Sequence, residues 1–178
     1  ALMNMFAKTT KRFLTVPTIR DAINSNISNC YENILNGLNN RYKTEFPEGM
    51  PLVCACEKGR FEDVKLLITG RNNAVNGSNG NNMTLKEMVN LEGAFGTWRC
   101  TPLEAAAQCE HFDLVQYLIK EGGADPNIAH CHGENALHAA AWYNKKNTDL
   151  IKFLLKHMSL DSINQKDSSR WIETPVDR

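Results

Sequence analysis

The sequence predicts an all-α solenoid of repeated helix–turn–helix units with a separate helix in front of them. A short segment rich in small residues recurs along the chain, and an amphipathic pattern follows each of its first three copies. The first 44 residues carry no copy. A unit of about 33 residues cannot bury its own apolar face, so the units must stack into one continuous core.

The recurring segment predicts the first helix of each unit. Its four copies are Gly49–Cys56, Cys100–Ala107, Glu134–Ala141 and Glu173–Asp177. The second and third copies are 34 residues apart, whereas the flanking intervals of 51 and 39 residues indicate insertions. Proline directly after threonine, as at Thr101 and Pro102, is a common helix opening. Runs of alanine within these segments allow the first helices to pack closely.

A second helix is expected in each of the first three units. Apolar residues recur there at intervals of three and four, the period of one helix face. These segments are Phe61–Ile68, Phe112–Ile119 and Leu150–Leu155. Turn-forming residues at Gly122–Asn127 end the second unit.

These units resemble ankyrin repeats. The family pattern T-P-L-H-x-A-A, followed by a turn, an apolar helix and G-A-D-x-N, is matched best by Thr101 to Asn127. The third unit keeps Leu137–Ala141 but has Asn135 where threonine is usual, and the first unit has Met50 there. The resemblance implies a helical solenoid with hairpin fingers. The expected domains are a capping segment at 1–44 and repeats at 45–178, divided into 45–95, 96–129, 130–168 and an incomplete 169–178.

The segment before the repeats is expected to be a helical cap. Thr18 and Asp21 have the spacing of a capping box. An apolar stripe follows, which should lie against the first repeat: Ile19, Ile23, Ile27, Tyr31, Ile34, Leu38 and Tyr42. A partner-binding or membrane-surface helix is the alternative, but the opposite face is poor in lysine and arginine.

Two departures from a regular repeat are expected. Residues 69–86 are rich in asparagine and glycine and should form a long surface loop. The sequence ends at Arg178, within what should be the first helix of a fourth repeat, so the natural protein is expected to continue or to have that end covered.

Composition narrows the class of partner and the compartment. Twenty basic and 20 acidic residues give a formal charge of zero, which argues against a nucleic-acid ligand. No run of 18 apolar residues and no secretory signal are found, so no membrane role is expected. Six cysteines without such a signal indicate reduced thiols. We expect a cytoplasmic or nucleocytoplasmic protein, or one in a host cytosol if it is a secreted effector.

The sequence contains no motif that predicts catalysis or a cofactor. The phosphate-binding, dinucleotide-binding and nucleophile-elbow patterns are all missing. A metal or thiol site around Cys109, Cys131 and His132 is an alternative, but paired metal-ligand spacings are absent. We therefore predict no cofactor, no metal and no catalytic residue.

The resemblance instead implies a binding surface made by the finger tips and the ends of the first helices. Tryptophan, tyrosine and arginine are enriched among residues that dominate interface energetics, and all three tryptophans fall at these positions. The alternative is that one or two tryptophans pack against neighbouring fingers or the asparagine-rich loop. The candidate partner-binding residues are Trp98, Gln108, Cys109, Cys131, His132, Glu134, Trp142, Tyr143, Arg170 and Trp171.

The expected function is therefore a non-catalytic module that binds a protein partner through this surface. The alternative is a substrate-targeting segment of a larger enzyme or secreted effector, with its catalytic part beyond Arg178. The resemblance names no particular partner, because one fold serves many.

Overall fold

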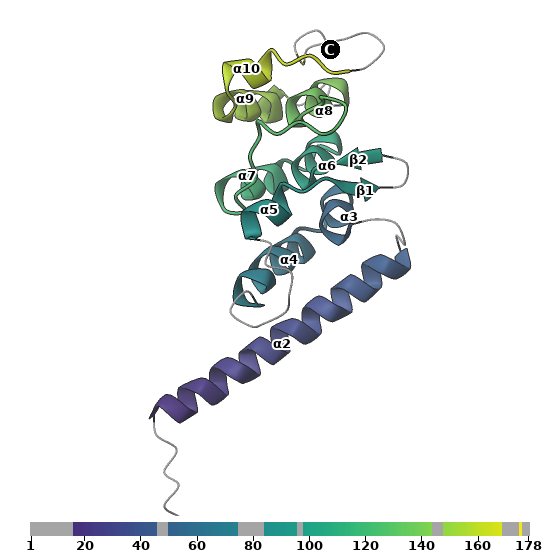
Figure 1. Cartoon of the computed structure of the whole chain (residues 1–178). Helices are drawn as coiled ribbons and strands as arrows, with labels where there is room; N and C mark the ends of the chain where they lie inside the picture. The colour runs from purple at the N-terminus through teal and green to yellow at the C-terminus, as the bar shows by residue number, and fades with distance from the viewer. Residues whose placement is uncertain are drawn as a thin grey trace, which may run out of the picture.

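The computed structural model describes residues 16–45, 50–74, 84–95, 98–143, 148–168 and 175. Helix pairs follow one another along a single axis in chain order (Figure 1). The three pairs are α3 (Pro51–Glu57) with α4 (Phe61–Ala74), α6 (Pro102–Gln108) with α7 (Phe112–Lys120), and α8 (Ala136–Tyr143) with α9 (Thr148–His157). The predicted all-α repeat solenoid is confirmed.

The first helices of the three pairs form the spine of the core. Helix α6 packs between α3 and α8, and each first helix also packs on the second helix of its own pair. Ala105, Ala106, Ala107 and Ala140 are buried at these contacts. Because alanine has no side chain beyond Cβ, neighbouring helices can approach closely, and the larger residues of the second helices fill the space behind them.

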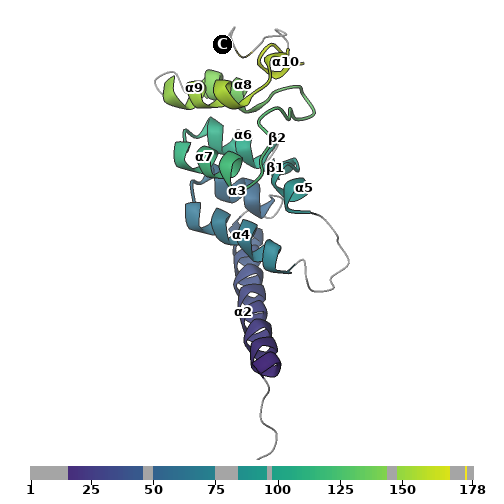
Figure 2. The ribbon, with the colours of Figure 1, turned by 90° about the vertical axis from the view of Figure 1, so that its left-hand side faces the viewer.

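Helix α2 (Val16–Glu45) precedes the repeats and packs on α3 and α4. Leu38 and Tyr42 are buried in this contact, whereas Ile34 is 40% exposed. The N-terminal end of α2 extends away from the stack (Figures 1 and 2). The described part of the stripe therefore meets the repeats through its last two members. The side chains of Thr18, Ile19, Asp21, Ile23, Ile27 and Tyr31 lie outside the described residues.

The prediction of a loop throughout residues 69–86 is wrong at both ends. Helix α4 continues to Ala74, and helix α5 (Leu85–Val89) begins before residue 86. Thr84 and Glu87 cap α5 reciprocally: the Glu87 N–H donates to Thr84 Oγ1 at 3.2 Å, and the Thr84 N–H donates to Glu87 Oε2 at 2.7 Å. This T-x-x-E spacing is a helix-start signal that outweighs the loop-like composition. Residues 75–83 lie outside the described part of the chain.

Two fingers precede the first helices of the second and third units. Strands β1 (Gly93–Phe95) and β2 (Trp98–Cys100) form an antiparallel pair. A Cβ atom on Gly93 would lie 2.6 Å from Met50 Cβ, so only glycine lets this hairpin approach α3. The third finger (residues 129–135) is closed by a bridge between Ala129 and Asn135.

Two asparagines join the turns of successive units on the side of the second helices. The Asp125 N–H donates to Asn90 Oδ1 at 2.7 Å, and Asn90 Nδ2 donates to the Gly123 carbonyl at 3.1 Å. One unit later, the Ser159 N–H donates to Asn127 Oδ1 at 2.7 Å, just before the short helix α10 (Leu160–Ile163). The same residue type thus satisfies backbone groups that the turns leave without a helical partner.

Within the described residues, no helix combines the length and apolar character that crossing a bilayer requires.

Candidate partner-binding surface

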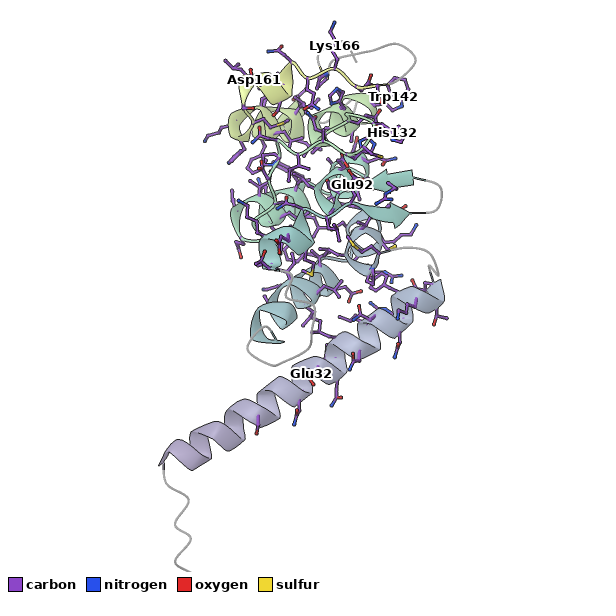
Figure 3. The ribbon with its side chains drawn as sticks, viewed as in Figure 1. Glu32, Glu92, His132, Trp142, Asp161 and Lys166 are labelled. Carbon is purple, nitrogen blue, oxygen red and sulfur yellow. The ribbon has the colours of Figure 1, made fainter. Side chains whose placement is uncertain are left out.

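The fingers and the ends of the first helices face one side of the solenoid. Trp142, His132 and Glu92 all lie towards the side that carries the β1–β2 hairpin (Figure 3). They come from three different elements: the end of α8, the third finger and the segment before β1. The repeat stack therefore gathers residues that are far apart in the sequence.

Among the described residues, the aromatic end of α8 is the most exposed apolar part of this side. Trp142 is 51% exposed and Tyr143 is 53% exposed, whereas Ala136, Leu137 and Ala140 of the same helix are buried. Burial of the helix therefore ends one turn before its C-terminus. Large aromatic side chains that a fold leaves exposed to solvent are typical of a contact surface. The expectation that Trp142 and Tyr143 would be exposed holds, and their role in binding remains a proposal.

The third finger presents Cys131 and His132 to solvent, while Glu134 is half-buried. Backbone contacts hold it in place, because the Ser168 N–H and hydroxyl each donate to the His132 carbonyl at 2.7 Å. Gly133 has a φ of 82° and lies against the backbone of residues 166–168, where a Cβ atom would crowd the chain. The finger therefore presents its side chains from a fixed backbone.

The structure describes the other candidate residues only in part. Gln108 and Cys109 are half-buried at the end of α6. Trp98 is the first residue of β2, but its side chain lies outside the described residues. Arg170 and Trp171 also lie outside them. Of the three tryptophans, the structure therefore shows the exposure of Trp142 alone.

Two ion pairs border the surface and balance its charge locally. Lys58 Nζ lies 3.1 Å from Glu57 Oε2 at the end of α3. Arg99 Nε lies 3.6 Å from Glu92 Oε2 beside the hairpin. These pairs are partly exposed and contribute little to folding.

The cysteines beneath this surface have the environment of structural thiols. Burial raises the pKa of Cys54 to about 11 and that of Cys100 to about 12, and it raises the pKa of Cys56 further. Burial also raises the pKa of Cys109. A protonated thiol is a poor nucleophile and a poor metal ligand. Within the described ranges, no three histidine, cysteine or acidic side chains are gathered so that they could hold a metal ion.

Sequence reasoning missed a buried polar contact beneath the third finger. Glu104 is 3% exposed, although it occupies the position where the third unit has His138. Its Oε1 atom lies 3.8 Å from Nδ1 of His130, which is 8% exposed. Burial is the largest cause that raises the pKa of Glu104, to about 8. The signal was an acidic residue at a core position, but the sequence did not show what faced it.

Comparisons with known proteins agree with this architecture. No curated protein matches the chain. A family model described as ankyrin repeats (3 copies) matches residues 73–167, which is more than half of the 178 residues. The matched region contains the second and third helix pairs and both fingers. The chain belongs to the ankyrin-repeat family.

Proposed function

We propose that this chain is a non-catalytic module that binds a protein partner through the aromatic end of α8 and the adjacent third finger. Ankyrin repeats are generally protein–protein interaction modules. The observation that carries the proposal is the exposure of Trp142 and Tyr143, at 51% and 53%, next to each other on one helix end. Burying such side chains against a partner removes large apolar areas from water with few rotatable bonds to order.

The surrounding groups suit the border of a contact surface. Cys131 and His132 are exposed on the third finger, and Glu134 and Gln108 are half-buried beside the first helices. A rigid finger loses little conformational entropy on association, because its backbone is already fixed by Gly133 and by the Ser168 contacts. Trp98, Arg170 and Trp171 belong to the proposed surface by their positions in the repeats.

We further propose that the partner is a protein rather than a nucleic acid, and that binding occurs in a reducing compartment such as the cytoplasm. The neutral formal charge supports the first proposal. The second is supported by the six cysteines, which are all free thiols, two of them buried as apolar core residues.

The test is affinity capture with the intact chain as bait, compared with Trp142→Ala and Tyr143→Ala variants. Leu160→Ala is the matched control, because Leu160 is 75% exposed on α10, outside the proposed surface. We expect Trp142→Ala to raise the dissociation constant for a captured protein at least tenfold, without a large change in the melting temperature of the chain. Equal binding by Trp142→Ala and Leu160→Ala would refute the proposed surface.

A further inference from the structure

We propose that Glu104 and His130 form a proton-operated latch between the second repeat and the third finger. A proton on the Glu104 carboxyl group keeps the finger against α6, and the finger loosens as Glu104 loses this proton with rising pH. Both side chains are buried, so the latch can be tested without a partner.

The geometry brings three titratable side chains into a row. Glu104 Oε1 lies 3.8 Å from His130 Nδ1, and His130 Nε2 lies 3.6 Å from Glu134 Oε2. The row crosses from α6 to the third finger, because Glu104 belongs to the helix and the other two residues to the finger. The imidazole is therefore bracketed by a buried carboxyl group on one side and a half-buried one on the other.

The hydrogen bonds show where a proton is needed. His130 Nδ1 lies 3.0 Å from the Glu134 carbonyl oxygen, which can only accept, so Nδ1 carries a proton. Glu104 Oε2 accepts the Thr101 N–H at 2.7 Å, but the buried Oε1 atom has no hydrogen bond. An ionised Glu104 would therefore bury a charge that is only half satisfied. A proton on Glu104 removes this cost.

The other neighbours of Glu104 in the described part of the chain do not supply an unpaired cation. On the hairpin side, Glu92 is paired with Arg99 at 3.6 Å, and the half-buried Cys100 thiol, whose pKa is raised to about 12, carries no charge at neutral pH. On α6 itself, Thr101 is neutral. His132 faces the His130 ring at a centroid distance of 5.4 Å, on the solvent side of the finger.

From α8, His138 packs within the core, where its ring bonds Asn135 at 2.9 Å. Burial, followed by the negative charges of Glu134 and Glu92, raises the pKa of Glu104 to about 8. His130 is the group of the third finger that faces this carboxyl group, at 3.8 Å.

The direction of the pH effect follows from linkage. Glu104 holds its proton in the closed state up to about pH 8 and releases it near its ordinary value of 4.5 once the finger opens and water reaches it. The stabilisation is therefore complete below pH 4.5, falls between about pH 4.5 and 8, and is absent above that range. The opening constant of the third finger should rise by about tenfold per pH unit across the window and then level off.

Hydrogen exchange tests the latch on the whole chain. The reporters are the amides of His130 and Gly133, which donate within the third finger at 2.8 Å each, and the amides of α7 serve as the internal reference. After correction for the intrinsic pH dependence of exchange, we expect the finger opening constant to rise steeply between pH 5 and 8 in the wild type. We expect it to stay flat in Glu104→Gln, which keeps the shape of the side chain but cannot ionise.

Two further variants separate the latch from general destabilisation. Glu104→His places the residue of the third unit at this position and should also remove the rise of the opening constant with pH. Glu134→Gln removes the more exposed carboxylate and should leave most of the slope in place. Equal slopes in the wild type and in Glu104→Gln would overturn the proposal.

A second measurement uses only the wild type, so it does not depend on whether the variants fold. The carboxyl carbon chemical shift of Glu104, followed by NMR in the wild type, should report a group that keeps its proton at pH 6 and titrates near pH 8. A Glu104 carboxyl group that is already ionised at pH 6 would overturn the proposal as well.

Discussion

The Tyr42 hydroxyl donates a 2.8 Å hydrogen bond to Asp63 Oδ2, and this contact fixes α2 on the first repeat. Arg41 pairs with the same carboxylate. The Arg60 guanidinium lies 5.3 Å from the centre of the Tyr42 ring and pairs with Glu45 at 2.8 Å. Tyr42 is fully buried, so one aromatic side chain joins the helix to the repeats through both apolar packing and charge.

Substitution of Tyr42 should measure how much α2 stabilises the repeats. Tyr42→Phe should lower the free energy of unfolding by about 1–2 kcal/mol, because a buried hydrogen bond to a carboxylate is lost. Tyr42→Ala should lower it by about 3–5 kcal/mol, because a cavity is added. Urea unfolding followed by circular dichroism measures both. Ile34→Ala, on the exposed part of the same helix, is the control and should cost less than about 1 kcal/mol; equal losses at both positions would contradict the assigned contact.

Replacing Glu110 with glycine should stabilise the fold. Its φ of 59° lies in the left-handed region, which costs a residue with a Cβ atom about 1–2 kcal/mol. We expect Glu110→Gly to raise the melting temperature, with a gain of about 1 kcal/mol after the added entropy of the unfolded chain is deducted. Gly59→Ala is the opposite case, because a Cβ there would lie 2.5 Å from His111 Cε1 at a φ of 65°. A stabilising alanine at Gly59 would show that the turn is not as tight as described.

Asn127 should be required for the junction between the second and third units. Asn127→Ala leaves the Ser159 N–H without its acceptor and should lower the free energy of unfolding by about 1–3 kcal/mol. Asn164→Ala is a matched control. The side-chain Nδ2 of Asn164 donates to the Leu160 carbonyl of its own turn at 2.9 Å, and this side chain is exposed. Chemical unfolding compares the two variants, and similar values would argue against a role for Asn127 between units.

Thiol accessibility should divide the cysteines into two groups. At pH 7.5 a maleimide should modify the exposed Cys30 and Cys131 in the folded protein within minutes. Cys54 and Cys56 should react only after unfolding, because they are buried and burial raises the pKa of both thiols. Mass spectrometry of digested, labelled protein locates the adducts, and early modification of Cys56 would mean that α3 opens readily.

The sequence was sufficient to predict the repeats because small residues and the helical period recur together. Leu103 and Ala105–Ala107 in the second unit reappear as Leu137 and Ala139–Ala141 in the third, and this pattern specified the packing of α6 on α8. The exposure of Trp142 was also predictable, since the core of a repeat uses aliphatic side chains instead. These inferences depend on spacing within one unit.

The features that the sequence did not predict depend on local capping and on contacts between units, which the spacing of apolar residues does not reveal. Composition suggested a loop where Thr84 and Glu87 start α5, because local capping outweighed the low helix propensity around it. The Glu104–His130 contact joins residues 26 positions apart in different units, and nothing in either local pattern indicates the other. The apolar stripe of α2 predicted that the helix would dock but not that Tyr42 would also bond Asp63 of α4.

Helix α2 is long and is held on the repeats near its C-terminal end, so a small rotation there moves its N-terminal end a long way. From Tyr42 back to Val16 the helix rises by about 39 Å at 1.5 Å per residue, while its described contacts with the repeats lie near its other end. A rotation of about 10° at the Tyr42–Asp63 contact would displace the start of the helix by about 7 Å, by simple geometry on that length. A small repacking at one buried tyrosine would thus be converted into a large movement at the far end of the molecule.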